Sequence, residues 1–396
     1  MKTKMDSVRE RIGIIDLARF YAMALVFYGH FIEEFMLLKN PVGAVQYKFI
    51  YSFHMVLFIV LAGYVVKEQD SEMGVGKFLK QRFLSRIVPF IFFTILMMVP
   101  TIFLDGKFFG LVLPSAEGYA KGLLWTAFGI PSFCIPSWFL LLIIGVELVH
   151  YSIFRFLKES NSRLLIAGVA FYVVGYLLNL KLDIFNPLKG RVVGWNYFYI
   201  HEAITLYAFY LMGIYIRRKR FLDKVSARIL APGAVVAFMV VLFTYQLNTG
   251  PFNFSIYNYV VIMFASHGHM FFFPLTAIAG CALILFLAKI TPGQKTMVWL
   301  GQNTLILMCL NGIFYHYINP GLAKWVLDNL SGSAMMVSTI GVIVTLASLS
   351  LCIPFVFVFR YYVVKLMSFF VALEEIAIFF EVAGCCGLPS NVETYT

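Results

Sequence analysis

Apolar segments long enough to cross a membrane recur along almost the whole chain, and they constrain the fold more than any other feature. A helix needs roughly 20 apolar residues to cross the hydrocarbon core of a bilayer. Ten such segments are centred near Ala24, Ile59, Thr94, Leu142, Val173, Leu206, Ala237, Ala279, Cys309 and Thr345. The chain is 61% hydrophobic and 13% charged, whereas soluble domains average about 45–50% apolar and about 25% charged. The sequence therefore predicts an all-α, polytopic transmembrane helical bundle of about ten spans.

The basic residues predict the orientation of this bundle. Cytoplasmic loops of membrane proteins carry an excess of Lys and Arg. With the amino terminus in the cytoplasm, 23 of the 31 basic residues fall on the cytoplasmic side and 8 on the opposite side. We therefore expect both termini in the cytoplasm. The same distribution explains the net charge of +11 as a matter of topology, which removes most of the case for a nucleic-acid partner.

Two parts of unequal size make up the chain. Residues 1–360 hold the ten segments without an internal repeat, and we expect them to form one transmembrane domain. Residues 361–396 are apolar at first but include Lys365, Glu374, Glu375 and Glu381, which favours an interfacial helix followed by a disordered tail. The six cysteines have neither disulfide nor metal-site spacing, so we interpret them as packing residues and expect no metal.

The first span carries a stripe of ionisable residues. Charges inside a span are costly, and they usually face the bundle interior or a cavity. Arg19 and His30 are eleven residues apart, which places them on one helix face about 16 Å apart. Asp16, Glu33 and Glu34 extend the same line. His30 is the catalytic candidate, with Glu33 or Glu34 orienting its ring, because an imidazole can accept a proton and return it. For Asp16 and Arg19, a purely structural ion pair is an equally good interpretation.

Further candidates lie in the next three spans. His54 is expected at a depth similar to that of His30, so the two could share a site; a position at the headgroup level is the alternative. Arg82 and Arg86 face the same way at the mouth of the third span and suit a phosphate group, although anchoring to anionic lipid headgroups explains them as well. Trp138 is either a membrane-interface residue or a platform on which a sugar ring stacks.

Several of these segments resemble the motifs of the acyltransferase 3 family of integral membrane O-acyltransferases, in the style of its sugar O-acetylase branch. In that family a basic residue, ten further residues and a His mark the first helix, and Arg19 and His30 match this spacing. The similar segments, in chain order, are residues 11–19 with Gly29 and His30, 51–58 with Gly63 and Tyr64, 78–89, 136–140 and 300–305. Two features depart from the family pattern. Arg82 and Arg86 are one residue further apart than the common Arg-x-x-Arg pair, and Asn311 stands where relatives often have a His.

The resemblance implies a function and roles for these residues. It implies transfer of an acyl group, usually acetyl, from cytoplasmic acyl-CoA to a hydroxyl of an extracytoplasmic glycan or lipid-linked sugar, at the bacterial cytoplasmic membrane. Arg82 and Arg86, with Asp16 and Arg19, would bind the acetyl-CoA phosphates. His30 would deprotonate the sugar hydroxyl or carry the acyl group transiently. His54 and Trp138 would lie on the acceptor side.

Two other functions fit parts of the pattern. A transporter or flippase of a lipid-linked sugar or a small anion could use the same stripe to line a path. Such proteins often show repeated halves, and this chain shows none. A membrane scaffold without a catalytic site fits poorly with five ionisable residues in one span.

Overall fold

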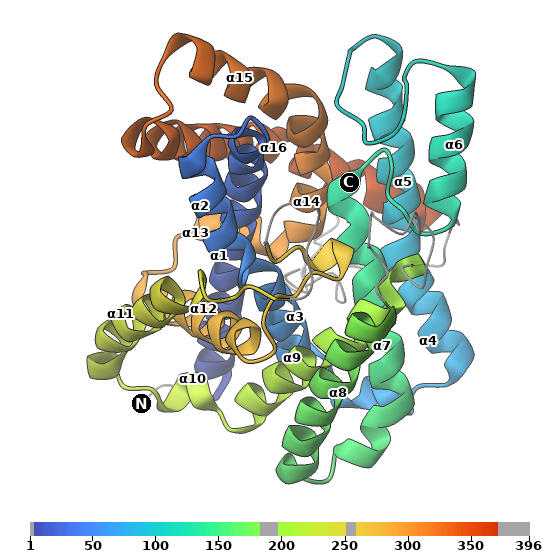
Figure 1. The fold of residues 1–396 in the computed structure, drawn as a ribbon. Helices are drawn as coiled ribbons and strands as arrows, with labels where there is room; N and C mark the ends of the chain where they lie inside the picture. Colours follow the sequence, from blue (N-terminus) through green and yellow to red (C-terminus); the bar gives the residue numbers. More distant parts are fainter. Residues whose placement is uncertain (1–3, 183–196, 251–258, 371–396) are drawn as a thin grey trace, which may run out of the picture.

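The computed structural model describes residues 4–182, 197–250 and 259–370, and these residues form a helical bundle (Figure 1). In these ranges the only strand-like pairing is an isolated bridge between Val261 and Ser266. The elements of the first half are α1 (Lys4–Leu37), α2 (Pro41–Tyr51), α3 (His54–Val65), η1 (Glu68–Glu72), α4 (Val75–Arg82), η2 (Phe83–Ile87), α5 (Val88–Met98), η3 (Val99–Ile102), α6 (Ala116–Ala127), η4 (Ile135–Ser137) and α7 (Trp138–Leu157).

The second half continues in the same style. Its elements are α8 (Asn161–Leu182), η6 (Tyr197–Tyr199), α9 (Ile200–Arg218), α10 (Phe221–Lys224), α11 (Ala227–Thr244), η7 (Ile262–Phe264), α12 (Phe272–Ile290), α13 (Lys295–Gln302), α14 (Thr304–Ile313), η8 (Phe314–Ile318), α15 (Asn319–Asn329) and α16 (Ala334–Phe370). Two of the short elements, η2 and η8, are π-helical turns.

The prediction of an all-α, multi-pass membrane bundle is confirmed. Among the described residues, eight helices are long and apolar enough to cross a membrane, and nine if α13 and the helix from Thr304 to Asn329, bent by 80°, form one span. Helix α9, at the predicted span near Leu206, is not one of these. It carries charged side chains near both ends, and most of its residues pack inside the bundle. The count of ten, like the orientation, stays a prediction. Helix α16 reaches Phe370, and most of the predicted interfacial helix and tail lies outside the described residues.

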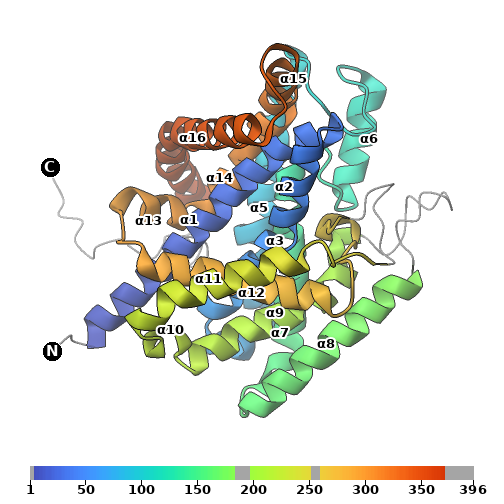
Figure 2. The same ribbon diagram turned by 60° about the vertical axis from the view of Figure 1, so that its left-hand side comes forward.

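Helix α1 is the central element of the bundle. It packs against α2, α3 and each helix from α12 to α16 (Figures 1 and 2). In its apolar segment 67% of the residues are buried, compared with 28% in the apolar segment of α16. Because α1 is enclosed by other helices, its ionisable stripe faces protein rather than lipid, which is the condition under which a bilayer tolerates such residues.

The second span is broken between α2 and α3, at Ser52 and Phe53. A break inside a membrane frees backbone carbonyls that water cannot reach, so side chains must satisfy them. The Ser52 hydroxyl donates to the Phe49 carbonyl at 2.6 Å, and Nδ1 of His54 lies 3.0 Å from the Ile50 carbonyl oxygen. The break therefore buries His54 at the start of α3, where the residue is 1% exposed.

Close helix contact fixes the depth of α3 relative to α9. A Cβ atom added at Gly63 would lie 2.0 Å from the Tyr210 carbonyl oxygen, and one at Gly213 would lie 2.1 Å from the Val60 oxygen. Only glycine permits this approach, which is typical of helix pairs in membranes. The Gly63-Tyr64 motif is thus a packing feature that holds the His54 helix in place.

Candidate functional site

His30 lies on α1 and is nine-tenths buried. Its Nδ1 is 2.5 Å from the side-chain oxygen of Asn311 on α14. An amide oxygen can only accept, so Nδ1 carries the proton, and Nε2 keeps its lone pair. The ring of Tyr315 meets the imidazole edge-on at 4.9 Å between centroids. Asn311, at the position where relatives often have a His, therefore fixes the tautomer and the orientation of His30.

The two carboxylates that follow His30 have other partners than expected. Glu33 accepts hydrogen bonds from the phenols of Tyr51 at 3.1 Å and Tyr315 at 3.3 Å. Both oxygens of Glu34 accept from the amine of Lys107, at 2.9 and 2.7 Å. The expectation that one of them orients the imidazole is corrected, because Asn311 occupies Nδ1. The spacing along one helix could not reveal donors that α2, η8 and the loop after η3 bring to these carboxylates.

Lys107 is held in place by backbone contacts with His316. Its amide donates to the His316 carbonyl at 2.8 Å, and Nδ1 of His316 donates to the Lys107 carbonyl at 2.7 Å. The π-helical turn η8 carries both Tyr315 and His316. In this turn Tyr315 donates to Glu33, and His316 bonds the loop that carries Lys107, the partner of Glu34. π-helical turns occur frequently at functional sites.

His54 lies at the start of α3, a helix that packs against α1, and its ring meets Tyr51 edge-on at 4.6 Å. That His30 and His54 share a site stays a prediction. The residues assembled around His30 form what we call the histidine cluster: His30, Glu33, Glu34, Tyr51, His54, Asn311 and Tyr315. Trp138 takes a different place. It is 7% exposed and packs against Tyr199 at 5.4 Å between ring centroids, so it is a buried residue and not one of a membrane-interface belt.

Arg82 and Arg86 converge on one carboxylate, that of Glu147 on α7. Nε of Arg82 lies 3.3 Å from one oxygen, and an Nη of Arg86 lies 3.0 Å from the other. The side chains are only 5%, 11% and 8% exposed, in the order Arg82, Arg86 and Glu147. Residues that anchor a protein to lipid headgroups point outward, so this burial argues against the lipid-anchoring interpretation. We call these three residues the arginine cluster.

The π-helical turn η2 explains the unusual spacing of the two arginines. It occupies Phe83–Ile87, which begins directly after Arg82 and contains Arg86. A π-helical turn holds one residue more than an α-helical turn, with i→i+5 hydrogen bonds. The extra residue that separates this pair from the family's Arg-x-x-Arg is taken up by the turn, and both guanidinium groups still reach Glu147.

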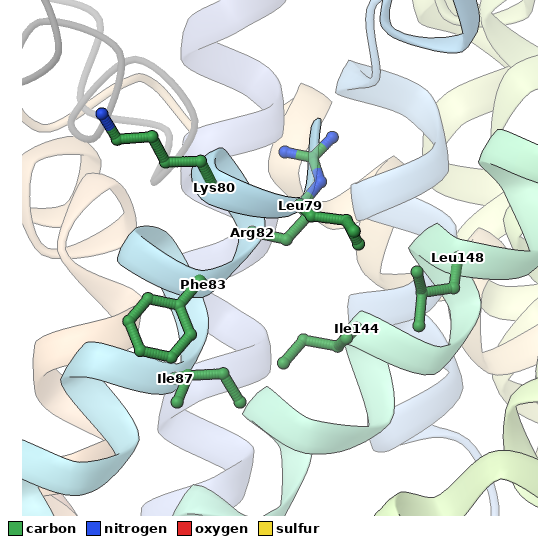
Figure 3. A pocket seen from close by; sticks show the side chains of 7 residues that line it. All are labelled: Leu79, Lys80, Arg82, Phe83, Ile87, Ile144 and Leu148. Atoms are coloured by element: carbon green, nitrogen blue, oxygen red, sulfur yellow. The ribbon is translucent and has the colours of Figure 1, made fainter. Parts of the chain in front are cut away.

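An apolar cavity of about 400 Å³ lies beside the arginine cluster, between α4, η2 and α7 (Figure 3). Its walls are Leu79, Lys80, Arg82, Phe83, Ile87, Ile144 and Leu148. The guanidinium group of Arg82 points away from Phe83, Ile87 and Ile144 (Figure 3), so only the aliphatic part of this side chain faces the cavity. The cavity is thus an apolar neighbour of the arginine cluster and offers little to a charged ligand.

Asp16 and Arg19 form an ion pair at 3.0 Å, and Gln302 donates to the second carboxylate oxygen of Asp16 at 3.0 Å. A Cβ atom added at Gly301 would lie 1.8 Å from the Asp16 carbonyl oxygen. The motif at 300–305 therefore needs its glycine, because the last turn of α13 is in direct contact with the backbone of α1. Arg19 is paired with Asp16, whereas Arg82 and Arg86 are paired with Glu147.

The sequence alone did not single out several buried ionisable residues, one in the arginine cluster and two outside both clusters. Glu147 had a usable signal, since it is an ionisable residue inside an apolar 20-residue helix. The pair of Glu202 and His267 had none: their side chains meet at 2.6 Å and are fully buried, but they are 65 residues apart in the sequence. Within the described ranges, no three His, Cys, Asp or Glu residues are grouped as a metal site would require.

Comparison with known proteins places the chain in a family. Residues 12–359 match the model of the acyltransferase 3 family, whose members share an acyltransferase domain. The match includes both clusters and the motif at 300–305. Neither a curated protein nor a solved structure is significantly similar to the chain. Together with the helices of spanning length, the family match shows that this chain belongs to the acyltransferase 3 family and is a multi-pass membrane acyltransferase.

Proposed function

We propose that this protein transfers an acetyl group from cytoplasmic acetyl-CoA to a hydroxyl of an extracytoplasmic glycan or lipid-linked sugar, at the bacterial cytoplasmic membrane. The observation that carries the proposal is the state of His30. It is a buried imidazole, deep in the central helix of a membrane acyltransferase, with its Nδ1 committed to Asn311 and its Nε2 left as a base. A base held in this way suits the activation of a hydroxyl.

The transfer balances with His30 as the proton carrier. Nε2 accepts the proton of the acceptor hydroxyl while the hydroxyl oxygen attacks the thioester carbonyl. The C–O bond forms, the C–S bond breaks, and the imidazolium returns the proton to the departing thiolate. A second route, in which Nε2 itself takes the acyl group before the sugar does, uses the same tautomer. Asn311 supports both routes because its oxygen keeps the proton on Nδ1.

The arginine cluster suits the donor. Two buried guanidinium groups converge on one carboxylate, so several of their N–H donors are gathered at one place. A phosphate group of coenzyme A suits such a place, because guanidinium groups match phosphate oxygens in charge and geometry. Arg19 keeps 14% of its side chain exposed beside Asp16, and we assign it a supporting role in donor binding.

The proposal is tested with the purified protein in detergent. We expect it to bind radiolabelled acetyl-CoA and to release coenzyme A slowly by hydrolysis. We also expect envelope glycans from a strain with the protein to be heavier by acetyl groups than those from a strain without it. Absence of donor binding together with unchanged glycan masses would overturn the proposal. Transport of a small anion by the reconstituted protein, without coenzyme A release, would favour the transporter instead.

A further inference from the structure

Glu33 stands out from its surroundings by its exposure. In the run of residues 29–36 on α1, every residue is buried except Glu33, which is partly exposed. A carboxylate in a membrane protein is tolerated where donors or an aqueous cavity compensate its charge. Glu33 is therefore the side chain of this run that another molecule can still contact.

The donors already bound to Glu33 leave part of its capacity unused. A carboxylate offers about four lone-pair positions, and the phenols of Tyr51 and Tyr315 take one position on each oxygen. Lys107, the nearby cation, is committed to both oxygens of Glu34. The hydrogen bonds recorded for Glu33 among the described residues thus come from neutral groups, and each of its oxygens can accept again.

Aromatic rings lie next to Glu33. Tyr51 stacks on Tyr47 at 3.8 Å between centroids, and Tyr259 meets Tyr47 edge-on at 5.4 Å. Tyr315 lies between Glu33, to which it donates, and His30, whose ring it meets. Aromatic faces bind the apolar side of a sugar ring, while a few well-placed polar groups fix its orientation. Helices α1 and α2, the π-helical turn η8 and the segment before η7, which holds Tyr259, contribute to this arrangement.

We propose that Glu33, held by Tyr51 and Tyr315, is a subsite that accepts hydrogen bonds from hydroxyls adjacent to the one acylated at His30. The inference rests on the proposed function and names the acceptor more closely. Glu33 is three residues after His30, about 4.5 Å along the helix axis, which is within the span of one sugar ring. A carboxylate repels phosphate and carboxylate groups, so the part of the acceptor that enters here is a neutral ring with free neighbouring hydroxyls.

The test compares acceptor and donor kinetics of Glu33→Gln. The acceptor probe is envelope glycan purified from a strain that lacks the protein. We expect KM for this glycan to rise about 10- to 100-fold, because a hydrogen bond to a charged acceptor is lost. Hydrolysis of acetyl-CoA in the absence of glycan is measured in the same preparations, so that a change in the donor reaction is distinguished from a loss of glycan binding. The matched control is Glu159→Gln, which removes an exposed carboxylate paired with Arg163 and should change neither value.

The possible results separate the subsite from the proposed function. An unchanged KM for glycan in Glu33→Gln, or a fall in kcat with KM unchanged, would overturn the subsite, while transfer by the wild type would still support the function. A wild type that neither hydrolyses nor transfers would overturn the function itself. If Glu33→Gln does not accumulate, Tyr51→Phe and Tyr315→Phe are tested instead, because they keep the carboxylate of Glu33 and remove one of its hydrogen-bond donors. Each should raise KM about 3- to 10-fold.

Discussion

The histidine cluster and the arginine cluster use different partners for their ionisable groups. In the histidine cluster, His30 is bonded to the amide of Asn311 and Glu33 to two phenols, which are neutral partners, and only Glu34 is paired with a cation, Lys107. In the arginine cluster, both guanidinium groups are paired with the carboxylate of Glu147. Neutral partners orient a group and leave its proton exchange intact, whereas two guanidinium groups that meet at one carboxylate gather charged hydrogen-bond donors in one place. The first arrangement suits proton transfer and the second suits anion binding.

The two clusters also have a structural feature in common. Each is adjacent to a π-helical turn, η2 at Arg86 and η8 at Tyr315. Such a turn inserts one residue into a helix and re-aims the side chains around it. The insertion lets Arg86 reach Glu147 from an unusual spacing, and it lets Tyr315 and His316 serve different partners. At each site the π-helical turn thus changes the direction of nearby side chains, while the helical segment that contains it continues beyond the turn.

The largest effect is expected from His30→Ala. Loss of the proton carrier should lower acyl transfer by about 10²- to 10⁴-fold, while the Kd for acetyl-CoA stays unchanged because the arginine cluster is intact. Radiolabelled transfer and equilibrium binding measure the two quantities. His269→Ala, which removes a partly exposed His away from the cluster, is the control. Transfer at the wild-type rate in His30→Ala would end the assignment of chemistry to the histidine cluster.

The reverse pattern is expected from the double substitution Arg82→Gln with Arg86→Gln. Loss of two charged hydrogen-bond donors should raise the Kd for acetyl-CoA about 100-fold, and transfer at saturating donor should change much less. Binding at several salt concentrations gives the measurement, since a phosphate contact weakens as salt rises. Arg163→Gln, an exposed arginine paired with Glu159, is the matched control. An unchanged Kd would return the pair to a structural role.

A smaller effect is expected from Asn311→Ala, which removes the partner of His30 but leaves the base. A misoriented ring should lower kcat about tenfold, with KM for donor and acceptor unchanged. Asn311→His should recover most of the loss, because a histidine also offers an acceptor nitrogen at the position where relatives often carry one. A loss that appears in KM, or that Asn311→His fails to recover, would show that Asn311 only packs the bundle.

The sequence predicted those features that depend on one helix at a time. The length of the apolar segments indicated a membrane bundle, and the spacing of Arg19 and His30 indicated one face of α1, because both follow from helix geometry. Partners from other helices could not be predicted. Asn311 is 281 residues from His30, and Glu147 is 61 residues from Arg86. Glu33 and Glu34 were found as candidates, but their donors come from segments whose approach depends on packing, such as the loop that carries Lys107.

The smallest effect, on thermal stability, is expected from Glu68→Gln. This substitution removes an exposed arginine–carboxylate pair of the same chemistry as the arginine cluster. Arg218 donates two hydrogen bonds to Glu68, at 2.9 and 3.0 Å, and Glu68 keeps 41% of its side chain exposed, compared with 8% for Glu147. The bond from Arg218, together with the charges of Arg218 and Arg217, holds the pKa of Glu68 below its ordinary value. The stabilisation it provides is therefore present above the ordinary pKa of a glutamate and is lost as the pH falls through the lowered value.

Solvent screening limits this stabilisation to less than about 1 kcal/mol. The measurement is the difference in Tm between the wild type and Glu68→Gln in detergent, followed from pH 7 downward. The difference should be small and constant near neutrality, should begin to shrink as the pH falls to about 4, the ordinary pKa of a glutamate, and should vanish only below the lowered pKa of Glu68. A Tm difference that persists in acid would show that Glu68 acts by packing. A Tm difference as large as that expected from breaking a buried ion pair would contradict the contrast between exposed and buried carboxylates in this protein.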